Sequence, residues 1–216
     1  MPRATAALPT AAPLIPPRPT LPALRAAAAG CRACDLWRRG TQTVFGEGPR
    51  SADVLFVGEQ PGNDEDLAGR PFVGPAGKLF DRALGEAGLD RARTYVTNVV
   101  KHFKWTPAGH RRLHKKPSAR EIGACLPRLE NELAVVKPDV LVCLGATAAQ
   151  ALLGRQFRVS VERGKVMATP LASHAVATIH PSAVLRQQSS ADRRREMARF
   201  IADLEVVAGL LNGRSR

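Results

Sequence analysis

The sequence predicts an α/β fold, a three-layer α/β/α sandwich with a central, mainly parallel, four-stranded sheet. Two observations favour this fold class. Short apolar runs end in glycine at 53–58 and 138–145, and such runs are typical of buried strands. Segments with apolar residues at helical spacing alternate with these runs. This alternation indicates a parallel sheet that helices cover on both faces.

The length of the chain, 216 residues, corresponds to one domain. Residues 1–22 are rich in Pro and Ala without periodicity, so we expect a flexible tail there. A single domain is expected at 23–212, and a short second tail at 213–216.

The first half of this domain contains two helix signals and two strand signals. An Ala-rich segment at 23–30 favours a short helix, and 53–58 is the first expected strand. Residues 74–89 carry apolar side chains at helical spacing, and Gly88 is suited to end that helix. A β-rich segment follows at 93–101.

The second half begins with a basic stretch at 101–117, which we interpret as a loop. Ser118 opens the next helix, because Glu121 three residues later completes a capping box. Pro127 lies inside this segment and is expected to bend or break the helix. The remaining elements are a strand at 138–145, a short helix at 146–154, a strand–turn–strand segment at 166–182 and a final helix at 190–211.

The charge of the chain indicates a polyanionic partner. The formal net charge is +13 and the isoelectric point is about 10.7, which favours nucleic acid. A membrane is the weaker alternative, because no apolar run is long enough to span a bilayer and no lipidation motif is present. No signal-peptide pattern opens the chain, so we expect a cytoplasmic protein, and we expect it to be a monomer.

The sequence contains four cysteines, and two of them form a Cys-x-x-Cys motif. In a reducing cytosol such a set indicates metal or redox chemistry before structural disulfides. The motif is Cys31-x-x-Cys34, and the other two cysteines are Cys125 and Cys143. Cys143 lies within an apolar strand pattern, which is typical of a buried core thiol.

Polar motifs follow three of the expected strands. They are GEQPG at 58–62, TNVVKH at 97–102 and IHPSAVLR at 179–186. Because sites in parallel α/β sheets form at the carboxyl ends of the strands, we expect these motifs to converge at one edge of the sheet.

These motifs, with two further segments, resemble those of the family-four uracil-DNA glycosylases. The resemblance spans roughly residues 28–210 and is carried by GEQPGNDEDLAGRPFVGPAG, TNVVKHFK, KKPSAREIGACLPRLENEL, LGATAAQALLG and IHPSAVLR. The stretch HRRLHKKPS at 110–118 resembles the loop that defines the UdgX-type branch, whose members bond covalently to uracil-containing DNA. Here His110 replaces the usual Lys of that loop, and Leu113 replaces Ile.

The resemblance implies a pocket that receives a uracil flipped out of the DNA stack. An amide reads uracil because its carbonyl accepts from N3–H while its NH2 donates to O4, and cytosine has those groups reversed. By resemblance Asn98 is this reader and Phe72 the stacking aromatic residue; taken alone, they would be a strand-end cap and a core side chain. The implied uracil-binding residues are Gln60, Phe72, Asn98 and His180.

His114 is the residue in which the resemblance implies unusual chemistry. A neutral imidazole is a competent nucleophile toward an oxocarbenium-like carbon, and its adduct lacks a good leaving group. His180 is expected to stabilise the uracil anion, and Glu59 to oppose the cation or orient a nucleophile. The implied catalytic residues are thus His114, Glu59 and His180. From charge and spacing alone, His114 is instead an exposed or phosphate-contacting residue of a basic loop.

Cations around this loop are expected to hold DNA phosphates. The expected DNA-binding residues are Arg111, Arg112, Lys115, Lys116 and Arg186. The resemblance also implies a [4Fe–4S] cluster whose ligands are Cys31, Cys34, His102 and Cys125. A zinc ion is the alternative, since zinc accepts three Cys and one His.

Three functions remain open at this point. The resemblance favours a DNA-repair enzyme that excises uracil from single- or double-stranded DNA and stops after one turnover, with His114 bonded to C1′ of the sugar. The first alternative is a conventional iron–sulfur uracil-DNA glycosylase that turns over by hydrolysis. The second is an iron–sulfur DNA-binding module without catalysis.

Overall fold

The computed structural model describes residues 9–213 of the chain. Its main sheet has five strands in the order β2-β1-β5-β7-β6, of which β6 alone is antiparallel to its neighbour. The strands are β1 (Val54–Gly58), β2 (Thr94–Asn98), β5 (Val140–Leu144), β6 (Val166–Thr169) and β7 (Ala172–Thr178). The mainly parallel sheet is confirmed, and the predicted count of four strands is wrong by one, because the short β6 pairs with β7 at the edge.

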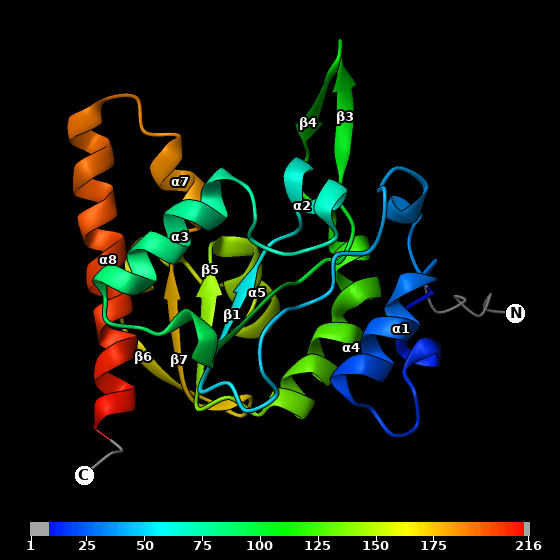
Figure 1. Ribbon diagram of the computed structural model, residues 1–216, viewed down its shortest axis with the longest axis horizontal. Coiled ribbons are helices and arrows are strands. Elements are labelled where there is room, and N and C mark those ends of the chain that lie inside the picture. The colour runs from blue at the N-terminus through cyan, green and yellow to red at the C-terminus, as the bar shows by residue number, and fades with distance from the viewer. Residues whose placement is uncertain (1–8, 214–216) are drawn as a thin grey trace, which may run out of the picture.

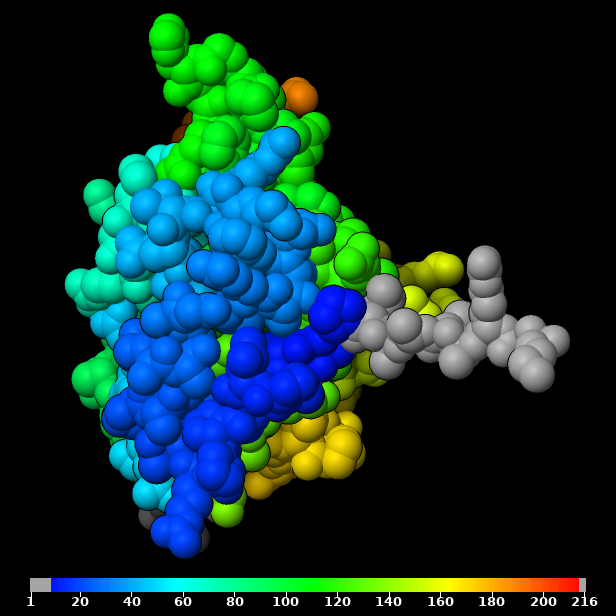
Figure 2. All heavy atoms as spheres, turned by 90° about the vertical axis from the view of Figure 1, so that its right-hand side faces the viewer, coloured from blue at the N-terminus to red at the C-terminus, as the bar shows by residue number. Residues whose placement is uncertain are grey.

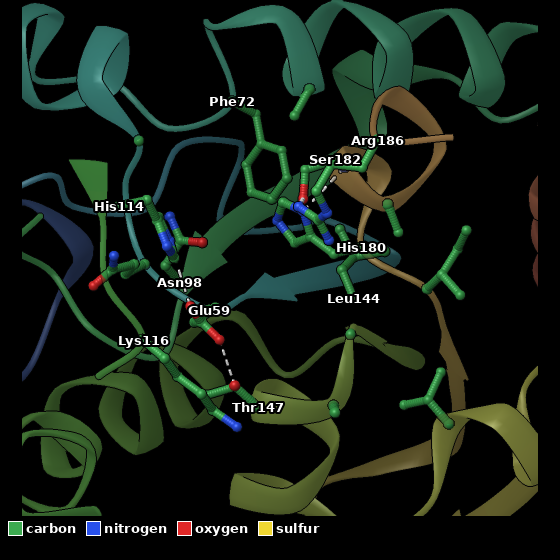
Figure 3. A pocket seen from close by; sticks show the side chains of 18 of the residues that line it. Glu59, Phe72, Asn98, His114, Lys116, Leu144, Thr147, His180, Ser182 and Arg186 are labelled. Atoms are coloured by element: carbon green, nitrogen blue, oxygen red, sulfur yellow. Dashed lines mark hydrogen bonds and ion pairs between the residues drawn. The ribbon is translucent and has the colours of Figure 1, made fainter. Parts of the chain in front are cut away.

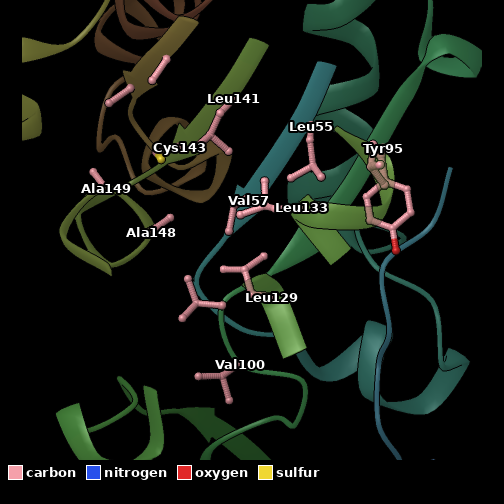
Figure 4. Packing of buried hydrophobic residues seen from close by; sticks show 14 of the residues in the cluster. Leu55, Val57, Tyr95, Val100, Leu129, Leu133, Leu141, Cys143, Ala148 and Ala149 are labelled. Carbon is pink, nitrogen blue, oxygen red and sulfur yellow. The ribbon is translucent and has the colours of Figure 1, made fainter. Parts of the chain in front are cut away.

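Helices cover both faces of this sheet, as the three-layer prediction required (Figure 1). Leu55 and Val57 of β1 point to the face covered by α4 and α5, and Figure 4 shows part of this core. Val54 and Phe56 point to the face covered by α3 and α8. The helices are α1 (Leu21–Ala29), α2 (Asn63–Ala68), α3 (Pro75–Glu86), α4 (Ala119–Val136), α5 (Ala146–Leu152), α6 (Val159–Glu162), α7 (Pro181–Leu185) and α8 (Ser190–Asn212).

Helix α4 forms where its sequence signals predicted a helix, but Pro127 does not interrupt it. Ser118 accepts a hydrogen bond from the Glu121 amide, and the Glu121 carboxylate accepts one from the Ser118 amide, which completes the capping box. The helix continues without a break through Pro127 to Val136. Its apolar side packs on the sheet, so tertiary burial outweighs the hydrogen bond that proline removes.

The basic stretch predicted as a loop is a β-hairpin. Strands β3 (Trp105–Ala108) and β4 (Arg111–His114) pair in antiparallel register, so that Gly109 and His110 form a two-residue turn. Gly109 has a φ of +56°, which glycine adopts readily in a tight hairpin turn. The hairpin projects from the body of the molecule beyond the carboxyl ends of the sheet strands (Figure 1).

Part of the segment predicted as a flexible tail packs against the domain. Ala11 is buried and its amide donates to the carbonyl of Ala124 in α4. A single 3-10 turn, η1 (Ala12–Leu14), follows, and α1 already begins at Leu21. Figure 2 shows this N-terminal segment on one face, below the projecting hairpin. Residues 1–8 of that tail, and 214–216 of the second tail, lie outside the described residues.

Residues 9–213 also contain two further 3-10 turns, η2 (Asp35–Arg38) after the Cys-x-x-Cys motif and η3 (Arg91–Arg93) before β2. Among the described residues, no helix is both long enough and apolar enough to cross a membrane.

Candidate active site

A cavity of about 850 Å3 opens at the carboxyl ends of β1, β2, β5 and β7. The three motifs that follow strands meet there, as their positions predicted. Glu59 extends from β1, Asn98 ends β2 and His180 follows β7, while His114 reaches the cavity from the hairpin (Figure 3).

Gly58 forms the floor on which the predicted base-recognition residues converge. A Cβ atom added at Gly58 would collide with Asn98 Oδ1 and would lie 3.0 Å from Phe72 Cζ and 3.4 Å from His180 Nε2. A side chain here would therefore fill the space that these three groups share. Glycine at the strand end keeps that space open.

Phe72 has a backbone conformation that is rare for an aromatic residue. Its φ is +57°, and its carbonyl oxygen lies against Gly77 in α3, where an added Cβ would collide with it. The ring packs beside Phe80, with ring centroids 5.3 Å apart, and beside His180 at 6.1 Å. A strained backbone of this kind persists where surrounding contacts hold it in place. Here Gly77 leaves room for the Phe72 carbonyl and Phe80 packs beside the ring, so both residues fix the ring at the wall of the cavity.

Asn98 is buried, and a buried ion pair supports its backbone. Its carbonyl accepts a 2.8 Å hydrogen bond from the Lys101 ammonium, which also forms an ion pair with Glu132. Within residues 9–213 its side-chain amide makes no hydrogen bond, although it lines the cavity. The amide is thus held in place with its hydrogen-bonding capacity available to a ligand.

His180 is held in one tautomer by its own loop. The Ser182 amide donates to His180 Nδ1 at 3.2 Å, and Ser182 Oγ lies 2.8 Å from the same nitrogen. Arg186 donates to Ser182 Oγ, which leaves that hydroxyl proton for His180. Since Nδ1 accepts, the ring proton is on Nε2, facing the cavity. Burial, with smaller effects from Arg186 and His114, lowers the pKa of His180 to about 4, so the ring is neutral at pH 7.

Glu59 lies between His114 and Thr147. Its Oε2 accepts a 2.5 Å hydrogen bond from the Thr147 hydroxyl, and its Oε1 lies 3.4 Å from His114 Nε2. Partial burial lowers the pKa of His114; Glu59 raises it and Arg186 lowers it further. The net shift favours the neutral imidazole at pH 7, which is the nucleophilic form.

Gln60 lines the cavity, and both Gln60 and Arg112 have protein partners that the sequence did not indicate. The Gln60 amide donates to the carbonyls of Lys104 and Lys115 and accepts from the Lys104 amide, so it joins both strands at the base of the hairpin. The Arg112 guanidinium pairs with buried Asp66 at 2.7 Å and lies over the rings of Phe103 and Trp105. Arg112 therefore anchors the hairpin to α2 in this structure, where a phosphate contact was expected.

The other predicted DNA-binding cations are exposed. Arg111 and Lys115 lie on the hairpin and its continuation, whereas Lys116 and Arg186 line the cavity mouth. Sequence reasoning did not find Thr147 or Ser182 as partners of site residues. Each is a hydroxyl inside a quoted motif, Thr147 in LGATAAQALLG and Ser182 in IHPSAVLR, and no sequence pattern identifies its partner.

Three of the four predicted metal ligands are cysteines that lie near one another beside α4. Cys31, Cys34 and Cys125 are free thiols. Burial raises the pKa of Cys125 to about 12, with smaller raising effects from Cys34 and Cys31, which places the three thiols within electrostatic reach of one another. His102 is buried beside Gly40, which lies six positions after Cys34. A Cβ atom added at Gly40 would lie 3.2 Å from the His102 ring.

In the described part of the chain, no group of three or more His, Cys, Asp or Glu side chains is close enough for one metal ion. The chemistry of the set nevertheless fits an iron–sulfur cluster, because thiolates are the usual ligands and histidine replaces cysteine in some clusters. Burial lowers the pKa of His102 to about 4, which keeps its ring in the neutral form that ligates metals.

Comparisons with known proteins indicate the same family as the sequence motifs. Residues 45–205 match the family described as the uracil DNA glycosylase superfamily. The chain is similar to the type-4 uracil-DNA glycosylase of Archaeoglobus fulgidus, with 41% identity over 72% of this chain and 78% of that protein. Similar type-4 uracil-DNA glycosylases occur in Thermotoga maritima (38% identity; 76% and 82% covered) and Pyrobaculum aerophilum (36% identity; 79% and 87% covered).

Proposed function

The chain belongs to the uracil DNA glycosylase superfamily, and from this premise we propose that it excises uracil from DNA and keeps the resulting sugar bonded to His114. This would place it in the UdgX-type branch of the family. The observation that supports the covalent step is the position of His114, whose ring reaches the same cavity as the base-recognition residues, 3.4 Å from Glu59.

Uracil recognition uses the buried wall of the cavity. The Asn98 amide accepts from uracil N3–H and donates to O4, a pattern that cytosine does not match. Phe72 stacks on the flat face of the base. His180 donates from Nε2 to O2, because its Nδ1 is already an acceptor for Ser182. A neutral donor aimed at the developing anion stabilises the transition state without the cost of burying a charge.

Bond cleavage transfers the electron pair of the N-glycosidic bond to the uracil, which leaves as an anion held by His180. Glu59 opposes the positive character that develops at C1′. A lone pair of the neutral His114 ring then forms the N–C1′ bond and leaves an imidazolium. The proton on its other nitrogen passes through Glu59 or water to the uracil anion, so the products are neutral uracil and an alkylated imidazole. This adduct lacks a good leaving group and persists.

DNA binding relies on the positive charge around the cavity. Arg111, Lys115, Lys116 and Arg186 are exposed, and we expect them to contact phosphates of the bound strand. We expect both single- and double-stranded uracil DNA to be substrates. A single strand avoids the free energy of unpairing the uracil, which is a few kcal/mol.

A [4Fe–4S] cluster held by Cys31, Cys34, His102 and Cys125 is part of this proposal. It would join the segment before η2 to α4 and to the base of the hairpin, and so have a structural function. A zinc ion in the same place is the alternative. Iron and sulfide analysis of purified protein, together with a thiolate-to-iron absorbance band, separates the two; zinc without iron would contradict the cluster.

A denaturing gel tests the proposed reaction. The protein is incubated with a labelled single-stranded oligonucleotide that contains one uracil, and then heated in SDS. We expect a slowly migrating band that His114→Ala removes, while that variant releases uracil and leaves an abasic site. His110→Ala is the matched control, because His110 lies in the same hairpin but at its exposed turn.

The two alternative functions give different results in the same assay. Abasic DNA without an adduct from the unaltered protein indicates a conventional glycosylase and contradicts the covalent step. Neither uracil release nor an adduct indicates a binding module without catalysis. If His114→Ala neither traps nor releases uracil, His114 has another indispensable function and the division of labour proposed above is wrong.

A further inference from the structure

Thr147 lies on the side of Glu59 opposite to His114. Its hydroxyl donates a 2.5 Å hydrogen bond to Glu59 Oε2, while Oε1 of the same carboxylate lies 3.4 Å from the His114 ring (Figure 3). The two oxygen atoms of Glu59 are therefore directed to different partners. Neither the base-recognition wall nor the metal-ligand set includes Thr147.

The fold fixes the position of this hydroxyl. Gly145 turns the chain out of β5 with a φ of +91°, and an added Cβ there would lie 3.1 Å from His180 Cβ. Thr147 follows in the first turn of α5 and is only 6% exposed. A threonine in a helix has only two favoured rotamers, and the hydrogen bond to Glu59 holds Thr147 in one of them.

A hydroxyl hydrogen bond to one carboxylate oxygen has two consequences. It stops rotation of the carboxylate and keeps Oε1 toward His114. It also occupies Oε2, the oxygen that would otherwise be available to accept a proton from water. Water and His114 compete for the same C1′ carbon, so the group that holds the carboxylate influences which of them reacts.

We propose that Thr147 is a positioning residue that, by holding Glu59 through Oε2, directs the reaction of C1′ to His114 and away from water. This inference rests on the proposed function, because it concerns the fate of the sugar after uracil leaves. The alternative is that Thr147 only fills space at the start of α5, in which case its hydroxyl does not affect the products.

The test is the partition of products. Thr147→Val keeps the shape of the side chain and removes the hydroxyl, and Thr147→Ser restores the hydroxyl without the methyl group. Each protein reacts in excess with a single-stranded uracil oligonucleotide, and uracil released, adduct and abasic DNA are quantified. For Thr147→Val we expect the ratio of abasic DNA to adduct to rise by about tenfold, the scale of one lost hydrogen bond to a charged group. Thr147→Ser should restore most of the original ratio.

A matched control separates this effect from general destabilisation. Thr43→Val removes a hydroxyl from another half-buried threonine that does not line the cavity, and its product ratio should be unchanged. Destabilisation lowers the amounts of adduct and abasic DNA together, whereas the proposal requires the adduct to fall and the abasic DNA to rise. Thr147→Ala removes the same hydroxyl and provides the comparison if the valine variant does not fold.

The pH dependence gives a second readout. The groups that act on His114 are Glu59, which raises its pKa, and Arg186, which lowers it; His180 is neutral above pH of about 4. In Thr147→Val the Glu59 carboxylate is no longer held, so it should raise the pKa of His114 less than in the unaltered protein. The pH below which the trapping rate falls should therefore be lower in this variant. An unmoved acid limb together with an unchanged product ratio would overturn the proposal.

Failure of this inference is distinct from failure of the proposed function. If the unaltered protein forms no adduct, the proposed function fails. If it forms the adduct and Thr147→Val forms the same fraction, only the assignment of Thr147 fails.

Discussion

The cavity wall and the hairpin differ in how they are built, although both contribute to one site. Asn98 ends β2, whereas Phe72 lies in the turn before α3 and His180 in the connection after β7; Asn98 and its supporting Lys101 are buried. His114 lies on a two-stranded hairpin that projects into solvent, and its side chain is 52% exposed. A two-stranded hairpin has marginal stability by itself, so its pose depends on contacts with the body.

Several of those contacts are polar. Gln60 joins the hairpin strands at their base, and Arg112 joins β4 to Asp66 of α2. The difference suggests a division of labour, in which the rigid wall recognises the base and breaks the bond while the hairpin decides the fate of the sugar. Variants of the wall should therefore affect excision and trapping equally, and variants of the hairpin should affect trapping more.

The largest effect is expected from the wall. His180→Ala removes the donor that faces uracil O2, and loss of one such donor typically lowers a rate by about 10²–10³-fold. Because uracil must leave before the sugar can be trapped, adduct and free uracil should fall by the same factor in a single-turnover assay. A variant in which the adduct fell much more than the release of uracil would contradict this expectation.

A smaller effect, confined to trapping, is expected from the base of the hairpin. Gln60→Ala removes the three hydrogen bonds that join Lys104 and Lys115, so trapping should slow by about tenfold while excision changes less. Gln60→Glu is the matched variant, since it keeps the volume but places a carboxylate against two carbonyl oxygens. Equal losses of excision and trapping would instead support the sequence-based prediction that Gln60 binds uracil.

The pH dependence of trapping should show a neutral nucleophile. The pKa of His114 lies below its ordinary value of 6.5, because burial and Arg186 outweigh Glu59. Protonation removes the lone pair, so the single-turnover trapping rate should fall as the pH is lowered, with its midpoint below 6.5. An acid midpoint at or above 6.5 would show that His114 is not desolvated in the manner that the structure indicates.

The smallest effect concerns salt. Lys115→Gln should lower the slope of log affinity against log salt concentration by about 0.7 on single-stranded DNA, since one phosphate contact is lost. Arg112→Gln should change that slope less, because the Arg112 charge is already paired with Asp66. Fluorescence anisotropy with an oligonucleotide that lacks uracil measures both slopes without the covalent step.

The sequence was sufficient to predict the wall of the site and insufficient to predict the hairpin. Strand β1 is buried on both faces and therefore has a continuous apolar pattern, which locates its carboxyl end and the groups that follow it. The hairpin has mostly exposed residues, and its pairing depends on Gln60 and on a glycine turn. No apolar alternation in the sequence indicated these contacts.

Buried polar partners explain the remaining differences. Arg112 has the charge of a phosphate ligand, and only the fold shows that Asp66 and two aromatic rings surround it. Thr147 follows an ordinary strand–glycine–helix pattern, and its contact with Glu59 joins residues 88 positions apart. Single-residue properties predict which groups are chemically able to act; tertiary contacts determine which of them do.

The central claim, that His114 becomes bonded to the sugar, is tested most directly by mass spectrometry of the denatured reaction. The intact mass should equal that of the protein plus the oligonucleotide minus uracil, and digestion should place the modification on the peptide that contains His114. Unmodified protein accompanied by free abasic DNA, or a modification on any other residue, would contradict the account.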